Sequence, residues 1–494
     1  MTSEGPGGAT RICLRLSSPT IKGTLAQIEH CRPHTDLAEI RIDLLEPEER
    51  KNLAALPEAA GIPLILSARR PEDGGKWGDA GESEPERIQT LTSLLDSGGW
   101  AYVDIEYDRS MSRVEDAARS NRVRIIRSRI DSLGTLLDGS VAELASWIRS
   151  VAAQGDLPKM ETFCGGSRQL LTLVRAALAT EDVTDKILFG LGEYGAASRL
   201  LSGRLGSLWT YGSPEDIRTL DILYRLREFT HNTPVYAVVG NPVAHSRSPI
   251  IHNTWLREAG LPGTYIAMRT DDAAAMLEIC DIIGITGLSV TVPHKETVLS
   301  LCDYSGHLAR KIGAANTLLR AGDGWRARNT DAAGFLAPLP KVLGLDSVKQ
   351  LRGKKALVIG AGGAARAAVW AMADVGVDMV ILNRSVDKAR RLAMEVGAKW
   401  GPLAPESQSL LADGVDFAVQ TTSVGMHPKE GEDPIPWWNP SDCALVYDLI
   451  YRPEKTKLLL RAEAAGTAVI NGALMLEHQA RLQFELFTGH PAPN

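Results

Sequence analysis

A cluster of glycines follows an apolar segment in the second half of the chain, and its chemistry suits a phosphate. The turn reads Gly360, Ala361, Gly362, Gly363 and Ala364. Glycines permit a sharp bend and a close approach of backbone, and free N–H groups at a helix N-terminus attract the negative charge of a pyrophosphate. The spacing predicts a dinucleotide site, and a plain tight turn between a strand and a helix is the alternative.

The next apolar segment ends in Asn383, Arg384 and Ser385. Folds that bind NAD usually place an acidic residue there, on the ribose 2′-hydroxyl. A guanidinium instead suits a 2′-phosphate, because it forms charge-assisted, bidentate hydrogen bonds. The pattern therefore favours NADPH over NADH as the cofactor, and a solvated arginine at a helix start is the alternative.

Upstream of that turn, hydroxyl and amide side chains gather in short motifs with one Lys/Asp pair. The side chains suited to a polyhydroxylated carboxylate are Ser246, Ser248, Ser289, Thr291 and Asn316. The pair is Lys295 and Asp331. Reduction of a ketone by hydride leaves an alkoxide that must be protonated, and a lysine held by an aspartate can supply that proton. A surface ion pair is the alternative reading of the two residues.

These motifs need a frame of strands, and the first 230 residues show short apolar runs that alternate with helical patterns. The expected strands are Ile12–Leu16, Leu37–Asp43, Pro63–Ser67, Ala101–Glu106, Val123–Arg127, Pro158–Glu161, Ile187–Gly190 and Leu208–Tyr211. Eight strand–helix units predict an α/β fold with a (β/α)8 barrel. A second α/β pattern begins with an expected strand at Lys355–Ile359, and an expected helix at Leu474–Phe487 closes the chain.

Three charged residues share one face of the second expected strand. A period of two places Glu39, Arg41 and Asp43 on one side and the isoleucines between them on the other. In a barrel these charges point inward, where they need partners or a ligand. A half-exposed antiparallel strand is the alternative.

Composition favours a small-molecule partner. Of the 494 residues, 44% are hydrophobic and 23% are charged, which is typical of a globular protein. The net charge is -6 and no long run of one sign occurs, so the sequence does not indicate binding to nucleic acid or to a membrane. Six scattered cysteines form no CxxC pair, which predicts neither a metal site nor disulfides. Residues 1–11 contain no apolar core of a signal peptide, so we expect a cytoplasmic protein.

Residues 234–494 resemble shikimate dehydrogenase, on the polar motifs, the Lys/Asp pair and the glycine turn quoted above. The resemblance implies that Ser246 and Ser248 bind the substrate carboxylate and that Lys295 and Asp331 are catalytic. It implies substrate contacts for Ser289, Thr291, Asn316, Tyr451 and Gln479, and cofactor contacts for Thr421, Met426 and Gly472. Many members have asparagine where Ser289 stands. The implied reaction is NADPH-dependent interconversion of 3-dehydroshikimate and shikimate, with quinate as the rival substrate.

Residues 10–228 resemble type I 3-dehydroquinate dehydratase, and the order of the two halves matches the fused dehydratase–dehydrogenase proteins. The resemblance implies that Lys159 forms a Schiff base with the substrate ketone, which makes the adjacent proton acidic. It implies that Glu39, Arg41, Arg69 and Arg199 bind and orient the substrate.

The barrel half departs from its family at the proton carrier. The family has a histidine on strand five, where this chain has Arg129, and His30 and His34 are the only histidines before residue 230. General acid/base catalysis contributes about 10²–10⁴-fold in rate. We therefore predict a weakened or silent dehydratase. Two alternatives stay open: an enzyme that recruits another acid/base such as Glu106, and a non-catalytic binding and scaffold domain.

Four domains are expected. They are a dehydratase-like barrel at 10–230, a substrate domain at 234–336, an NADP-binding Rossmann-like domain at 337–455, and C-terminal helices at 456–494 that pack back on the substrate domain.

Overall fold

The computed structural model describes residues 10–79 and 81–493, which form two compact units that divide between Thr286 and Gly287. Most of the N-terminal segment on which the expected localisation rests lies outside the described residues. Within the described ranges, no helix combines the length and the apolar character that crossing a bilayer requires.

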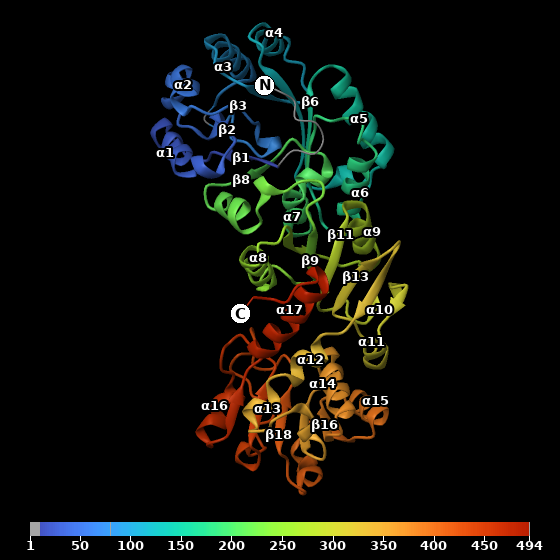
Figure 1. Cartoon of the computed structure of the whole chain (residues 1–494). Helices are drawn as coiled ribbons and strands as arrows, with labels where there is room; N and C mark the ends of the chain where they lie inside the picture. The colour runs from blue at the N-terminus through green and yellow to red at the C-terminus, as the bar shows by residue number, and fades with distance from the viewer. Residues whose placement is uncertain (1–9, 80, 494) are drawn as a thin grey trace. The chain divides into compact units, whose positions relative to one another are not determined.

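The first unit begins with a barrel of parallel strands, each followed by helical structure (Figure 1). The strands are β1 (Arg11–Arg15), β2 (Leu37–Arg41), β3 (Leu64–Ser67), β4 (Tyr102–Glu106), β5 (Arg124–Asp131), β6 (Leu157–Phe163), β7 (Ile187–Leu191) and β8 (Trp209–Gly212). They pair in the order β7-β6-β5-β4-β3-β2-β1-β8, and one parallel bridge between Lys186 and Ser207 closes the ring. All eight expected strands and the barrel are confirmed.

Helices cover the outside of the barrel. They are α1 (Ile21–Cys31), α2 (Leu56–Ala60), α3 (Glu84–Ser97), α4 (Ser112–Ser120), α5 (Val141–Ala153), α6 (Ser167–Leu178) and α7 (Gly192–Leu200). Capping boxes fix the starts of two of them: Ser83 and Glu86 exchange hydrogen bonds at α3, and Ser140 and Glu143 do so at α5.

Alternation along the strands separates an inner layer from an outer one. Leu37, Ile65, Tyr102, Ile126 and Trp209 belong to a cluster that fills the barrel interior. Isoleucines 40 and 42 instead belong to the cluster shared with the surrounding helices. The period of two therefore turns Glu39 and Arg41 inward, as the sequence predicts. Asp43 instead lies in a short helical turn, because β2 ends at Arg41.

The first unit continues beyond the barrel with β9 (Val235–Gly240) and β10 (Thr264–Arg269), which pair in parallel, and with α8 (Ser248–Glu258) and α9 (Ala273–Ile283). The division between the units falls inside β11 (Ile285–Val290). In the second unit β11 pairs antiparallel with β13 (Thr317–Ala321), and β13 pairs with β14 (Gly324–Arg328), which pairs with β12 (Tyr304–Ser305). Short helices follow these strands: α10 (Thr297–Leu301), α11 (His307–Ile312), α12 (Asp331–Leu336) and α13 (Leu339–Val342).

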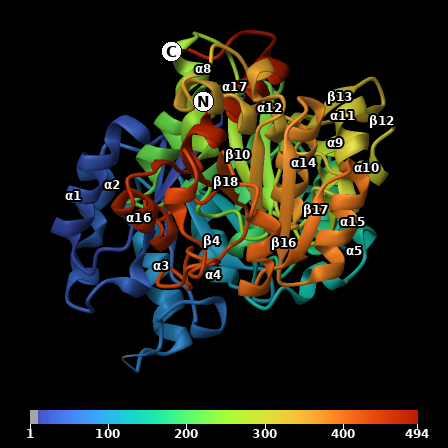
Figure 2. The same ribbon diagram turned by 90° about the horizontal axis from the view of Figure 1, so that it is seen from below.

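A six-stranded parallel sheet forms the rest of the second unit, in the order β17-β16-β15-β18-β19-β20. Its strands are β15 (Lys355–Ile359), β16 (Asp378–Asn383), β17 (Lys399–Pro402), β18 (Phe417–Gln420), β19 (Leu445–Asp448) and β20 (Ala468–Ile470). The helices are α14 (Gly363–Asp374), α15 (Val386–Val396), α16 (Lys457–Ala464) and α17 (Ala473–Thr488). Both views show α14 and α15 beside β16 (Figures 1 and 2). The strand order reverses between β15 and β18, where such sheets bind their ligands.

Candidate active sites

An ion pair joins the two residues predicted to be catalytic in the second unit. Lys295 Nζ lies 2.6 Å from Asp331 Oδ2, and Asp331 is buried while the lysine side chain is 21% exposed. Lys295 lies in the turn after β11, and Asp331 is the first residue of α12. The aspartate therefore fixes an ammonium group that solvent and a substrate can still reach.

Asn316 connects this pair to the last helix. Its amide nitrogen donates to Asp331 Oδ1 at 2.8 Å and to Gln479 Oε1 at 3.3 Å. The amide oxygen of Asn316 accepts from the backbone N–H of Thr330 at 2.7 Å. The backbone N–H of Ala315 donates to the Lys295 carbonyl at 2.8 Å, which fastens the two loops together. Lys295, Asp331, Asn316 and Gln479 thus form one connected polar site.

Gly334 permits the close approach of α12 and α17 that brings Gln479 into the site. A Cβ at this position would lie 2.8 Å from the Cβ of Gln479 and 3.0 Å from the carbonyl oxygen of Met475. Any side chain at position 334 would push the two helices apart. The position of Gln479 therefore depends on glycine at this position.

Gln483 is a site residue that sequence reasoning missed. It lies one turn after Gln479 and is buried, and its amide oxygen accepts a hydrogen bond from Ser289 Oγ at 2.7 Å. Its amide nitrogen donates to the carbonyl of Asn316 at 2.9 Å and to Thr317 Oγ1 at 3.0 Å. Gln483 therefore holds the hydroxyl of Ser289. The helical spacing of the two glutamines was the only sequence signal.

Thr291 lies between Ser289 and Lys295, in the turn after β11. Its carbonyl accepts from the backbone N–H of His294 at 3.0 Å, and its side chain is half-buried. The turn therefore presents Thr291 and Lys295 together.

Ser246 and Ser248 lie in the first unit, at the start of α8. Ser248 is the first residue of this helix and is buried, and its backbone N–H donates to Ser246 Oγ at 3.2 Å. Hydroxyls at a helix N-terminus suit a carboxylate.

The glycine turn between β15 and α14 fits a pyrophosphate. A Cβ at Gly362 or Gly363 would meet nothing within 4 Å, so the space over this backbone is open. No side chain caps the helix at Gly362, which leaves its first N–H groups for a ligand. Gly360 has a φ of +114°, and a Cβ there would lie 2.3 Å from Thr421 Oγ1, so the position requires glycine.

Further predicted cofactor residues surround this edge of the sheet. Thr421 Oγ1 donates to the Ile359 carbonyl at 2.8 Å, and Met426 is exposed beyond it. Asn383, Arg384 and Ser385 follow β16, and Arg384 is exposed at the strand's carboxyl end. The residues that would meet the nucleotide therefore come from the ends of β15, β16 and β18.

The loop after β19 lies against Gly472. The backbone N–H of Gly472 donates to the Ile450 carbonyl at 3.1 Å, and a Cβ would lie 2.0 Å from the Leu449 carbonyl oxygen. Tyr451 is half-buried in this loop. Gly472 precedes α17, which carries Gln479, so the predicted substrate residue Tyr451 lies next to the base of that helix.

The Lys/Asp site and the glycine turn are connected within the second unit. Arg366, on the first turn of α14, donates to the carbonyl of Ile312 at 2.6 Å, just before the loop that leads to Asn316. Ala332 and Phe335 of α12 belong to the same apolar cluster as Val369 of α14. The helix α12, which begins with Asp331, therefore packs on α14, the helix that follows the glycine turn.

Lys159 lies fully buried inside the barrel, among carboxylates. Its Nζ is 2.8 Å from Asp104 Oδ2 and 3.4 Å from Glu39 Oε2, and 4.9 Å from the ring centre of Tyr211. Glu39 also accepts from Arg69 at 3.0 Å. The structure thus brings together three of the residues predicted for this site, Lys159, Glu39 and Arg69.

The arginines keep two of the inner carboxylates ionised. Burial alone would raise the pKa of Glu161, but the charges of Arg15 and Arg69 lower it to about 2. Burial opposes ionisation of Glu39 too, and there Lys159, Arg69 and Arg15 hold its pKa far below the usual range. These two carboxylates are therefore poor proton carriers at neutral pH.

Several polar atoms near the mouth of the barrel are buried without a partner among the described residues. They are Ser67 Oγ, Arg69 Nε and Glu106 Oε2. Buried polar atoms in native proteins are almost always hydrogen-bonded. A cluster of unsatisfied donors and acceptors near a buried lysine is what a site for a polar ligand needs.

Two predicted substrate residues have other partners. Arg41 pairs with Asp43 at 2.6 Å, beside the barrel interior. Arg199 donates to the Tyr211 carbonyl at 2.7 Å and to Asp216 at 2.9 Å, which ties α7 to the segment after β8. The structure does not join Arg199 to the lysine cluster.

Arg129 does not point into the barrel. Its guanidinium lies 4.8 Å from the ring centre of Tyr107 and 5.9 Å from that of Trp147, which belongs to α5. The residue in register with Lys159 is Ser128. Because neighbours in register share a face, Ser128 faces the interior and Arg129 faces the helices.

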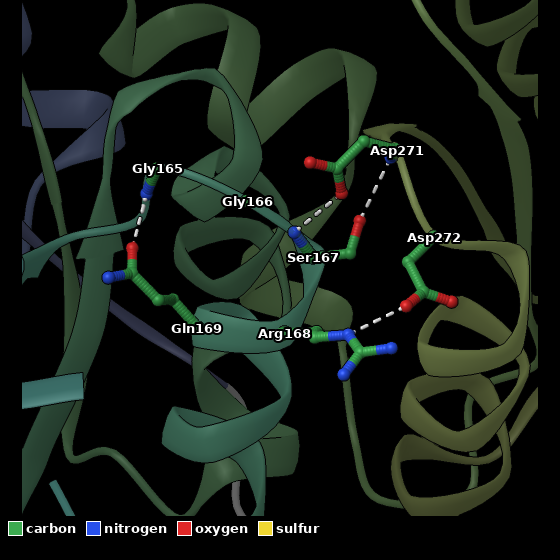
Figure 3. A pocket seen from close by; sticks show the side chains of 7 residues that line it. All are labelled: Gly165, Gly166, Ser167, Arg168, Gln169, Asp271 and Asp272. Carbon is green, nitrogen blue, oxygen red and sulfur yellow. Dashed lines mark hydrogen bonds and ion pairs between the residues drawn. The ribbon is translucent and has the colours of Figure 1, made fainter. Parts of the chain in front are cut away.

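A cleft of about 540 Å³ lies where the loop after β6 meets the segment after β10, within the first unit (Figure 3). The backbone N–H of Ser167 donates to Asp271 at 2.9 Å, and that of Asp271 donates to Ser167 Oγ at 3.1 Å. Arg168 pairs with Asp272 at 2.9 Å. None of the predicted site residues lines this cleft, and its polar groups fasten the barrel to the segment that follows β10.

Three family models match the chain. Type I 3-dehydroquinase matches residues 12–219, the shikimate dehydrogenase substrate binding domain matches 238–318, and shikimate / quinate 5-dehydrogenase matches 343–423.

Among curated relatives, a chloroplastic bifunctional 3-dehydroquinate dehydratase/shikimate dehydrogenase of Arabidopsis thaliana is 31% identical, over 94% of this chain and 80% of the relative. A shikimate dehydrogenase (NADP(+)) of Methanopyrus kandleri is 41% identical, over 53% of this chain and 92% of the relative. A solved shikimate 5-dehydrogenase of Thermus thermophilus, in complex with NADP(H) and shikimate, is 34% identical over 53% of this chain and 95% of that chain, with a TM-score of 0.46.

Proposed function

Because the chain belongs to the family of bifunctional 3-dehydroquinate dehydratase/shikimate dehydrogenases, we propose that its second half reduces 3-dehydroshikimate to shikimate with NADPH. The observation that carries the proposal is the polar site of Lys295, Asp331, Asn316 and Gln479, in the same unit as the open glycine turn.

The residues of this site divide the reaction among them. NADPH, when bound, supplies the hydride. Lys295 gives its proton to the ketone oxygen as the alkoxide forms, so charge does not accumulate on oxygen. Asp331 orients the ammonium and accepts a hydrogen bond from a ring hydroxyl, while Asn316 and Gln479 fix the ring.

The nucleotide site favours NADPH over NADH. Gly362 and Gly363 leave their backbone open to the pyrophosphate, and Arg384 is exposed at the end of β16 to meet the 2′-phosphate.

The test is the full chain with 3-dehydroshikimate and each nicotinamide cofactor, followed at 340 nm. We expect turnover with NADPH and a KM for NADH at least tenfold higher. No oxidation of either cofactor would overturn the proposal. Quinate and NADP⁺, assayed in parallel, separate the two cyclic hydroxy acids.

The barrel half, we propose, forms a Schiff base between Lys159 and the ketone of 3-dehydroquinate but turns over slowly. The buried amine and the unsatisfied polar atoms near it support covalent capture of a polar ketone. Slow turnover follows from the missing histidine, because the inward position beside Lys159 is Ser128, whose hydroxyl does not titrate near neutral pH.

Borohydride trapping tests this proposal. Incubation with 3-dehydroquinate and borohydride should add one substrate-derived mass to the peptide that contains Lys159, and Lys159→Met should abolish the label. An unlabelled parent chain would refute a Schiff-base function and favour a binding or scaffold domain.

A further inference from the structure

We propose that Glu106, the last residue of β4, moves the proton in the barrel's elimination reaction, in place of the missing histidine. The inference rests on the proposed Schiff-base function of Lys159 and deepens it, because it names the group that completes the site.

The strand register places Glu106 on the inner face. On β4, Asp104 contacts the amine of Lys159 at 2.8 Å, and Glu106 follows two residues later, so both belong to the same face. Glu106 is in register with Ser128, and Ser128 is in register with Lys159. The valine and isoleucine that alternate with these acids belong to the outer cluster.

The position of Glu106 along the strand suits a bound substrate. Glu106 follows Asp104, which contacts the amine of Lys159, by two residues, or about 6.6–6.8 Å along the strand. Glu106 therefore lies one further step towards the carboxyl end of β4 than Asp104, the end at which barrel enzymes hold their substrates. A substrate joined to Lys159 through its ketone carbon has the carbon that loses a proton directly beside that bond.

The two carboxylate oxygens of Glu106 differ in their hydrogen bonding. Oε1 accepts from Arg87 at 2.7 Å and lies 3.7 Å from Arg70. Oε2 is buried and has no hydrogen-bond partner among the described residues. Arg87 holds the carboxylate in place, and Oε2 is left to accept a proton.

The other inner carboxylates are unsuited to this task. Asp104 is bound to the amine of Lys159, and arginines keep Glu39 and Glu161 ionised. Burial raises the pKa of Glu106, against the opposing effect of Arg87. A raised pKa favours a carboxyl group that first accepts a proton and then returns it.

The reaction balances with this one group. The lysine amine condenses with the C3 ketone and releases water, which gives an iminium. Glu106 takes a proton from C2, and the C–H electrons form an enamine. The protonated carboxyl then gives that proton to the C1 hydroxyl, which leaves as water while the C1–C2 double bond forms. Hydrolysis of the iminium frees 3-dehydroshikimate and the amine, and Glu106 is again a carboxylate.

The test is Glu106→Gln in the full chain, which keeps the size of the side chain and an acceptor for Arg87. We expect 3-dehydroquinate dehydration, measured at 234 nm, to fall about 100-fold, within the range for loss of a general acid/base. Borohydride labelling of Lys159 should persist, and shikimate oxidation in the second half should stay within twofold of the parent chain, which reports an intact fold.

Glu84→Gln is the matched control. Glu84 is the other carboxylate bound to Arg87, at 2.8 Å, but its side chain is 40% exposed, at the start of α3. The control variant removes the same charge from the same arginine and should keep dehydration within threefold. Glu106→Asp, which keeps the carboxyl group, should retain more activity than Glu106→Gln.

Three results overturn the inference. One is dehydration by Glu106→Gln within threefold of the parent. Another is a parent chain whose Lys159 is labelled but which shows no dehydration, because Glu106 would then not suffice. An unlabelled Lys159 would instead remove the Schiff base proposed above, and this inference with it.

Discussion

Asp448, at the end of β19, makes the stability of the nucleotide-binding sheet depend on pH. Burial raises the pKa of this carboxyl from its ordinary value of 3.8 to about 6, although Thr456 donates to it at 2.6 Å and the backbone N–H of Ile450 donates at 2.9 Å. The folded chain therefore prefers the neutral acid. Stability from this group is complete below about pH 4 and is lost as the pH rises through 6.

The magnitude follows from the shift. A difference of about two pKa units, at 1.36 kcal/mol each, corresponds to about 3 kcal/mol. Asp448→Asn does not titrate and removes this dependence. The free energy of opening of β19 in the variant, minus that in the parent chain, should rise by about 2–3 kcal/mol from pH 4.5 to pH 7.5. Any effect of the substitution that does not depend on pH adds equally at both pH values.

Native-state hydrogen exchange of the β19 amides, corrected for the intrinsic rate at each pH, measures this quantity. The control is Asp442→Asn, which removes the same charge from an exposed position just before β19 and should show no such trend. An Asp448→Asn difference that is the same at both pH values would refute the reasoning.

Other substitutions test the site of the second unit. Arg384→Ala should raise the KM for NADPH about tenfold and leave the KM for NADH unchanged, because it removes one charge-assisted contact to the 2′-phosphate. The control, Arg390→Ala, lies further along α15 and should change neither KM. An equal effect of Arg384→Ala on both cofactors would contradict the assignment. Gln483→Leu removes the amide oxygen that accepts from Ser289 Oγ at 2.7 Å, so the KM for shikimate should rise about tenfold with a smaller change in kcat. Unchanged kinetics on shikimate would show that Gln483 has no part in substrate binding.

The elements of the barrel could be predicted because each strand carries an apolar run that only a buried sheet accommodates. The inward charges of β2 were predictable too, since Ile40 and Ile42 mark the outer face. On β5 the same reasoning fails, because the adjacent isoleucines 125 and 126 give no alternation. The face of Arg129 depends on register with β6, which no local pattern encodes.

Contacts between residues that are far apart in the chain could not be predicted from the sequence either. Ser289 and Gln483 are 194 residues apart, and their contact exists because α17 returns to the end of β11. The pairing of Arg199 with Asp216, in the segment after β8, was likewise not visible in the sequence. The Lys295/Asp331 pair was predictable from its motifs, whereas the position of Gln479 beside it depends on the close helix contact at Gly334.

Reduction of 3-dehydroshikimate by Lys295→Met in the full chain tests the central claim most directly. We predict that the turnover number falls by about two to four orders of magnitude, the contribution of a general acid, while the Kd for NADPH, measured by fluorescence titration, stays within twofold of the parent. A variant that still reduces 3-dehydroshikimate at the parent's rate would contradict the account, because the proton would then come from elsewhere.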